Sequence, residues 1–220
     1  MEPMNLDIAR HNMITQQARA AGVLDDRILH LLTQLPRETF VPEGYRELAF
    51  ADTSLSLGNG RHMMTPIEEG LILQALNLDA AETVLEVGTG SGYFTALLAS
   101  QAKHVYSVDI CKEMVVSASA HLAALSINNV TLEVGNASQG FAKFAPYDVI
   151  VVTGSVPSLP KAFLKALKAG GRIFAIVGEG EKMEAVLVEK RSADKIETRI
   201  LFETVVEPLQ GLNKQNHFEF

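Results

Sequence analysis

The sequence predicts an α/β fold, a doubly wound seven-stranded sheet with an antiparallel C-terminal hairpin and an N-terminal helical extension. Three observations support it. From about Glu82 onward, short β-branched runs alternate with helical patterns, which indicates right-handed βαβ crossovers and a parallel sheet. Residues 149–152 are apolar throughout, as in a strand covered on both faces. Residues 185–190 and 197–206 are strand-like but too close for a crossover helix, so they are expected to pair antiparallel.

The N-terminal part of the chain is mostly helical in pattern. Helices are expected over residues 5–20 and 25–35, the second with acidic residues at its start. Thr65 is predicted to cap a third helix, because it is followed by a proline and by Glu68, which can complete a capping box. Residues 40–61 are irregular and rich in Gly and Pro, and a loop of this length is often functional.

The remaining elements follow from the alternation of patterns along the chain. The other strands are expected at residues 83–87, 104–109, 130–134, 148–153 and 172–177. Helices are expected at residues 93–101, 112–125 and 157–168, the last one ended by residues 169–171, which contain two glycines.

The composition excludes several function classes. The chain has 19 basic and 26 acidic residues and a net charge of −7, so it lacks the basic surplus that nucleic-acid binding needs. Its single cysteine, Cys111, allows no intramolecular disulfide or cysteine-based zinc site, and its six histidines are too widely spaced for a helical metal pair. No signal peptide is recognisable, and the longest uncharged stretch, residues 114–132, is too polar for a membrane span. We therefore expect a cytoplasmic protein without a metal, a nucleic-acid partner or a membrane partner.

A glycine-rich turn follows the strand at residues 83–87 and opens the helix at residues 93–101. Its glycines let the backbone turn tightly and let a ligand approach the backbone amides. Asp109 ends the next strand about 20 residues after Gly88, where a carboxylate can accept hydrogen bonds from both hydroxyls of a ribose. Together, the turn and the acid predict an adenosine-type ligand, and the alternative is a purely structural glycine turn.

The spacing of the glycines narrows the range of ligands that this turn can be expected to bind. They follow the pattern GxGxG at residues 88, 90 and 92, whereas dinucleotide-binding turns have GxGxxG and P-loops have a lysine after the glycines. With the preceding Glu86, the turn resembles motif I of the class I S-adenosylmethionine-dependent methyltransferases, which have a Rossmann-like sheet. The resemblance implies S-adenosyl-L-methionine as cofactor. The cofactor contacts it implies are Glu86, Gly88, Thr89, Gly90, Ser91, Gly92, Tyr93, Asp109, Ile110, Asn136, Ala137 and Thr153. Such enzymes usually carry an acid at the position of Asn136, whose side-chain carbonyl can still accept a hydrogen bond from adenine.

Segments outside the glycine turn resemble one particular family within these methyltransferases. Residues 23–29, 36–42, 49–52, 152–157 and 205–209 are similar, in order, to signatures of the protein-L-isoaspartate O-methyltransferases. The resemblance implies methyl transfer to the α-carboxylate of isoaspartyl residues in damaged proteins or peptides. It also implies one methyltransferase domain over residues 1–220, and we expect a monomer or weak dimer. Its predicted parts are a helical lead with the acceptor-side loop (1–80), the cofactor-binding core (81–180) and the C-terminal antiparallel strands (181–220).

One signature of this family is altered. The family has Gly-x-Thr-Ile-Ser-x-Pro, with an active-site Ser near the acceptor, and residues 60–66 have Met64 in place of that Ser and His62 in place of the Thr. A thioether cannot donate a hydrogen bond to a carboxylate. The neighbouring Thr65 and His62 are therefore the candidate catalytic residues, although Thr65 is also the expected helix cap.

The altered signature leaves three hypotheses open. Isoaspartyl methylation can be supported by other donors, such as Thr53, Ser54 or backbone amides. The enzyme can instead keep the cofactor and methylate another acceptor, for example a small metabolite. In the third hypothesis the chain is a cofactor-binding module without catalysis.

Overall fold

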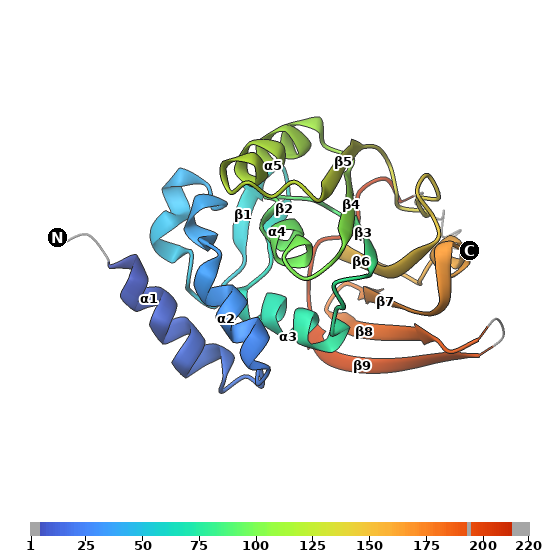
Figure 1. Ribbon diagram of the computed structural model, residues 1–220, viewed down its shortest axis with the longest axis horizontal. Coiled ribbons are helices and arrows are strands. Elements are labelled where there is room, and N and C mark those ends of the chain that lie inside the picture. The colour runs from blue at the N-terminus through green and yellow to red at the C-terminus, as the bar shows by residue number, and fades with distance from the viewer. Residues whose placement is uncertain (1–4, 193–194, 213–220) are drawn as a thin grey trace, which may run out of the picture.

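The computed structural model describes residues 5–192 and 195–212. Its main sheet contains the strands β3 (Thr83–Val87), β4 (His104–Asp109), β5 (Val130–Val134), β6 (Tyr147–Val156), β7 (Leu167–Glu179), β8 (Lys182–Lys190) and β9 (Ile196–Thr204). The strand order is β5-β4-β3-β6-β7-β8-β9, parallel as far as β7 and antiparallel from β7 to β9 (Figure 1). The predicted seven-stranded α/β sheet with antiparallel C-terminal strands is therefore confirmed. Residues 193–194, in the predicted β8–β9 turn, and residues 213–220, at the end of the predicted C-terminal part, lie outside the described residues.

Alternating side chains of the central strands enter two hydrophobic cores, one on each face of the sheet. Val149 and Val151 of β6 belong to one core, and Ile150 and Val152 belong to the other. The first core is covered by α3 (Pro66–Leu76), α4 (Tyr93–Ala99), α5 (Lys112–Ala124) and the N-terminal helices, and the second by α6 (Lys161–Ala166). Because both faces are covered, residues 149–152 of β6 are apolar throughout, as the sequence predicted.

The N-terminal helices pack at one end of the molecule, in blue in Figure 1. The predicted first helix is present as α1 (Leu6–Asn12), which continues into a π-helical stretch, η1 (Met13–Ala18). The second is α2 (Asp26–Gln34), and two 3₁₀ turns follow at η2 (Arg37–Thr39) and η3 (Glu43–Leu48). None of the helices in the described part of the chain is long and apolar enough to cross a membrane.

The predicted irregular segment 40–61 contains an element that the prediction lacked. Residues Leu55–Gly58 (β1) and Arg61–Met63 (β2) form an antiparallel hairpin. Asn59 and Gly60 make its two-residue turn with φ values of 53° and 69°. Asn-Gly is the preferred pair for such a turn because both residues tolerate positive φ. The prediction of an irregular loop was wrong here, and the Asn-Gly pair was the signal for the hairpin.

The helix predicted at residues 157–168 is shorter, because α6 spans only Lys161–Ala166. Pro160 is its N-cap residue, and a proline disfavours helical backbone at the residue before it, so the helix cannot begin earlier. Leu167 already pairs with Tyr147 in the sheet. Residues 169–171, expected to end the helix, therefore lie within β7, and that prediction was wrong.

Candidate functional site

A cavity of about 270 Å³ lies at the carboxyl ends of β3, β4 and β6. The strand order reverses between β3 and β6, and open α/β sheets bind ligands at such a point. The hairpin β1–β2 and residues 205–210, which we call the C-terminal strap, complete the cavity wall. The residues that line it include Ser54, Arg61, His62, Met64, Thr65, Glu68, Gly88, Gly90, Asp109, Ile110, Gly135, Ala137, Ser138, Thr153, Glu207 and Gln210.

The glycine turn has the backbone that its sequence predicts. Gly88, Gly90 and Gly92 have φ values of 101°, 52° and 85°, which side-chain-bearing residues rarely adopt. A Cβ on Gly88 would lie 2.1 Å from the Thr153 Oγ1 atom, and a Cβ on Gly92 would lie 2.8 Å from the Ala118 Cβ atom. Both positions therefore require glycine for conformation and for space.

Asp109 is placed where the sequence predicts a ribose-binding acid. It lines the cavity although its side chain is largely buried. Its Oδ2 atom accepts a hydrogen bond from the Gly90 amide at 3.0 Å, and its Oδ1 atom accepts one from the Cys111 amide at 2.8 Å. An ionised carboxylate has about four acceptor positions. Each oxygen of Asp109 can thus accept one more hydrogen bond, which matches the two hydroxyls of a ribose.

Glu86 lies beneath the turn and does not line the cavity. Its Oε2 atom accepts hydrogen bonds from the hydroxyls of Ser107, at 2.6 Å, and Thr95, and the Ser107 and Thr89 hydroxyls are 2.6 Å apart. Complete burial raises the pKa of Glu86 to about 8, against the opposing effect of the two hydroxyl hydrogen bonds. A contribution of Glu86 to cofactor binding must therefore act through the turn that it supports.

Asn136, the predicted adenine contact, lies at the edge of the cavity and is not part of its lining. Its Oδ1 atom accepts a hydrogen bond from the Ser138 amide at 2.9 Å, and its Nδ2 atom donates one to the Gly211 carbonyl at 3.1 Å. Its neighbours Gly135, Ala137 and Ser138 line the cavity instead. Ser138 is a residue that sequence reasoning missed, and only its closeness to Asn136 in the sequence could have indicated it.

The other predicted cofactor residues divide into two groups. Ile110, Ala137 and Thr153 line the cavity, whereas Thr89, Ser91, Gly92 and Tyr93 do not and form the back of the turn. The Tyr93 ring is fully buried against Phe40, with 5.3 Å between the ring centroids.

On the acceptor side, Thr65 forms the predicted capping box. Its Oγ1 atom accepts a hydrogen bond from the Glu68 amide at 3.2 Å, and the Thr65 amide donates one to the Glu68 carboxylate at 2.9 Å. A hydroxyl that accepts a hydrogen bond still has its own proton to donate. Among the described residues, the Thr65 hydroxyl donates to no partner, so its proton is available on the cavity wall.

His62 and Arg61 join the hairpin to the C-terminal strap. The His62 Nδ1 atom lies 2.7 Å from the Glu207 carboxylate, and the Arg61 Nη2 atom donates a hydrogen bond to the Gln210 side-chain carbonyl at 2.8 Å. Arg61 was missed by sequence reasoning, although it lies within the altered signature at residues 60–66. Ser54 lines the cavity, whereas Thr53, the other donor considered, does not.

Within residues 5–192 and 195–212, no group of three or more His, Cys, Asp and Glu side chains is placed to hold a metal ion. The site therefore combines a glycine turn, a buried acid and hydroxyl groups with the charged and polar acceptor-side residues Arg61, His62, Glu68 and Glu207. Such a set suits the binding of a nucleoside and the alignment of two reactants.

Comparison with known proteins gives a consistent result. Residues 9–214 match the family model described as protein-L-isoaspartate(D-aspartate) O-methyltransferase. The protein-L-isoaspartate O-methyltransferase 1 of Rhodopseudomonas palustris is 37% identical over 203 residues, which are 92% of this chain and 83% of the relative. The protein-L-isoaspartate O-methyltransferase of a Picosynechococcus species is 37% identical over 204 residues, 92% of this chain and 90% of the relative.

Solved structures show the same fold. A protein-L-isoaspartate O-methyltransferase superposes with a TM-score of 0.77 at 25% identity, over 92% of this chain and 66% of its own length. A Plasmodium falciparum structure in complex with S-adenosyl-L-homocysteine superposes with a TM-score of 0.78 at 20% identity, over 94% of this chain and 99% of its own.

Replacing Asp109 by alanine should weaken the binding of S-adenosylmethionine by more than about tenfold, because hydrogen bonds to a charged acceptor are lost. Isothermal titration calorimetry measures the dissociation constant. The matched control is Glu113→Ala, which removes an exposed carboxylate in the first turn of α5 that does not line the cavity. Equal affinities of the Asp109 variant and the control would contradict the assignment of Asp109.

Glu86 should make the stability of the fold depend on pH. Its pKa is raised from 4.5 to about 8, so between these values the folded chain keeps a proton that the unfolded chain releases. Its contribution to stability is therefore complete below pH 4.5 and is lost as the pH rises through about 8. Glu86→Gln should flatten the fall in the free energy of unfolding over this range, measured by urea denaturation. The exposed Glu184→Gln is the control, and an unchanged pH slope in Glu86→Gln would refute the prediction.

Proposed function

The chain belongs to the protein-L-isoaspartate(D-aspartate) O-methyltransferase family, and on this premise we propose that it methylates isoaspartyl residues in proteins or peptides. The methyl group of S-adenosyl-L-methionine is transferred to their α-carboxylate. The observation that carries the proposal is a single cavity lined by the glycine turn, by Asp109 and by the acceptor-side residues 61–65.

The residues of the cavity fit this cofactor. Gly88 and Gly90 present backbone without side chains, and Asp109 has free acceptor positions for two ribose hydroxyls. Ile110 and Ala137 provide apolar surface beside them for an adenine ring. When bound, S-adenosylmethionine would supply an electrophilic methyl group on a sulfonium centre. An oxygen of the acceptor carboxylate would form the new bond to the methyl carbon while the carbon–sulfur bond breaks, and S-adenosylhomocysteine would leave.

The reaction needs no general base. A carboxylic acid with a pKa of about 4 is already ionised at neutral pH, so the protein has to align the reactants and exclude water. The hairpin and the C-terminal strap can serve both purposes, since together they form part of the cavity wall. Arg61 and His62 hold them together through contacts with residues of the strap.

Thr65 is the proposed hydrogen-bond donor to the acceptor carboxylate. Met64, which replaces the family Ser, has a thioether that cannot donate. The Thr65 hydroxyl oxygen caps α3 by accepting a hydrogen bond, while the hydroxyl proton is available to a substrate in the cavity. Cap and donor are therefore different functions of one hydroxyl. The exposed Ser54 hydroxyl is a second donor on the same wall.

A different acceptor is the second candidate function. It is favoured by Met64 and by two carboxylates on the acceptor side of the cavity, those of Glu68 and Glu207. A module that binds the cofactor without catalysis is the third. The sequence-based expectations of a cytoplasmic chain, a monomer or weak dimer, and no nucleic-acid or membrane partner stay predictions.

The deciding experiment is methyl transfer from labelled cofactor to a pair of matched peptides, one with isoaspartate and one with aspartate. We expect labelling of the isoaspartyl peptide only, with calorimetry showing cofactor binding. Cofactor binding without labelling of either peptide would refute isoaspartyl methylation and favour the second or third candidate. No cofactor binding would refute all three.

Thr65→Gly should lower kcat/KM for the isoaspartyl peptide by about tenfold or more, because the lost hydrogen bond is made to a charged group. Glycine is a good N-cap, so the loss of helix stability should be only a few tenths of a kcal/mol. Thr65→Ser keeps both the cap and the proton and should retain activity near that of the parent chain. Equal activity of the glycine and serine variants would show that Thr65 is only a cap.

A further inference from the structure

Arg37 is a fully buried cation outside the cavity. Its guanidinium donates hydrogen bonds to the Ala49 carbonyl at 2.8 Å, to the Met64 carbonyl, and to the Glu69 carboxylate at 3.1 Å. It also lies 5.4 Å from the centroid of the Tyr93 ring. All of its partners belong to segments far from it in the sequence.

Two of these partners are parts of the site. Met64 lies in the acceptor-side segment 61–65, immediately before the proposed donor Thr65. Tyr93 is the first residue of α4, immediately after the last glycine of the turn. The Arg37 guanidinium therefore lies between the segment that would bind the acceptor and the turn that would bind the cofactor.

The arrangement depends on the planar shape of arginine. A guanidinium carries five N–H donors in a fixed fork, and Arg37 uses this fork to hold two backbone carbonyls and a carboxylate at once. The negative partner is Glu69, whose side chain is as completely buried as that of Arg37. Lysine has a single ammonium group and cannot reproduce these directions.

We propose that Arg37 is a positioning residue of methyl transfer, which fixes the acceptor-side segment 61–65 relative to the glycine turn through the Met64 carbonyl and the Tyr93 ring. Its catalytic consequence rests on the function proposed above, and its structural consequence does not. Correct alignment of acceptor oxygen and methyl carbon is the main task of such an enzyme, and a misplacement of about 1 Å can lower a rate by about 100-fold.

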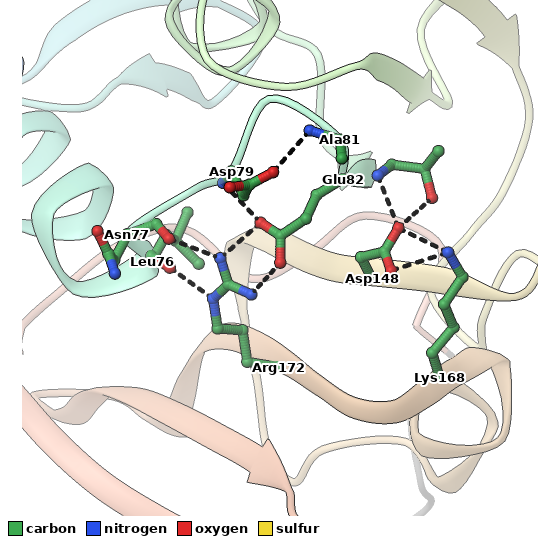
Figure 2. A network of polar contacts seen from close by, with 9 residues as sticks. Leu76, Asn77, Asp79, Ala81, Glu82, Asp148, Lys168 and Arg172 are labelled. Atoms are coloured by element: carbon green, nitrogen blue, oxygen red, sulfur yellow. Dashed lines mark hydrogen bonds and ion pairs between the residues drawn. The ribbon is translucent and has the colours of Figure 1, made fainter.

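The chain provides a matched control at the other end of α3. Arg172 donates hydrogen bonds to the Leu76 and Asn77 carbonyls and to both oxygens of the Glu82 carboxylate, as Figure 2 shows. Like Arg37, it holds two backbone carbonyls and one carboxylate. It lies at the C-terminal end of α3, however, and does not line the cavity.

The test compares Arg37→Lys with Arg172→Lys in the full chain. Both should lower the melting temperature. Only Arg37→Lys should speed hydrogen–deuterium exchange of the amides in residues 61–65, by about tenfold or more, and lower kcat for the isoaspartyl peptide by a similar factor. The dissociation constant of S-adenosylhomocysteine should change by less than about threefold, because Asp109 and the glycine turn remain in place.

Equal exchange of residues 61–65 in the two variants would overturn the proposal, and so would a loss of kcat that Arg172→Lys reproduces. If Arg37→Lys does not fold, Glu69→Gln takes its place, because it keeps an acceptor for Arg37 but removes the charge. Glu69→Gln should then also speed the exchange of residues 61–65 and lower kcat, but by a smaller factor. Unchanged exchange of these residues would again refute the proposal. If the parent chain does not methylate the isoaspartyl peptide, the proposed function fails while the exchange comparison still decides the role of Arg37.

Discussion

The close approach of Gly88 to Thr153 is the constraint on which the site depends. The Thr153 hydroxyl contacts the Val87 and Gly88 carbonyls, each at 3.0 Å, and so joins β6 to β3 where the strand order reverses. A Cβ on Gly88 would occupy this space. The turn that begins there brings the Gly90 amide to Asp109 at the end of β4. This contact between β6 and β3 thus holds the start of the turn, and the Gly90 amide then connects the turn to Asp109, the proposed ribose-binding acid.

Features that depend on neighbouring residues were predictable from the sequence. The capping box of Thr65 and Glu68, the glycine turn and the strands are encoded in short patterns, and the structure contains them. The hairpin turn at Asn59 and Gly60 was equally local, but it was missed because the strands on either side are only four and three residues long. The length of α6 was misjudged because the apolar pattern continues from the helix into β7.

Features that depend on distant residues were not predictable. Arg37 and Glu69 are 32 residues apart, and Arg61 and Gln210 are 149 residues apart. Local periodicity carries no information on such pairs, since a charged residue in a sequence is normally expected at the surface. Glu86 was predicted to contact the cofactor from the resemblance of the turn to motif I, and only the tertiary structure shows that its carboxyl is buried beneath the turn.

The charge of the acceptor side can be reconciled with a carboxylate substrate. The chain has a net charge of −7, and Glu68 and Glu207 both line the cavity. Each is already engaged, however. Glu68 accepts hydrogen bonds from the Thr65 amide and the Thr204 hydroxyl, and Glu207 contacts His62. These contacts partly offset the negative charge of the two carboxylates. In the described part of the chain, no protein group accepts a hydrogen bond from the Thr65 hydroxyl, so its proton is available to a substrate. In the proposed function, binding of a carboxylate then depends on local donors such as the Thr65 and Ser54 hydroxyls more than on the overall charge.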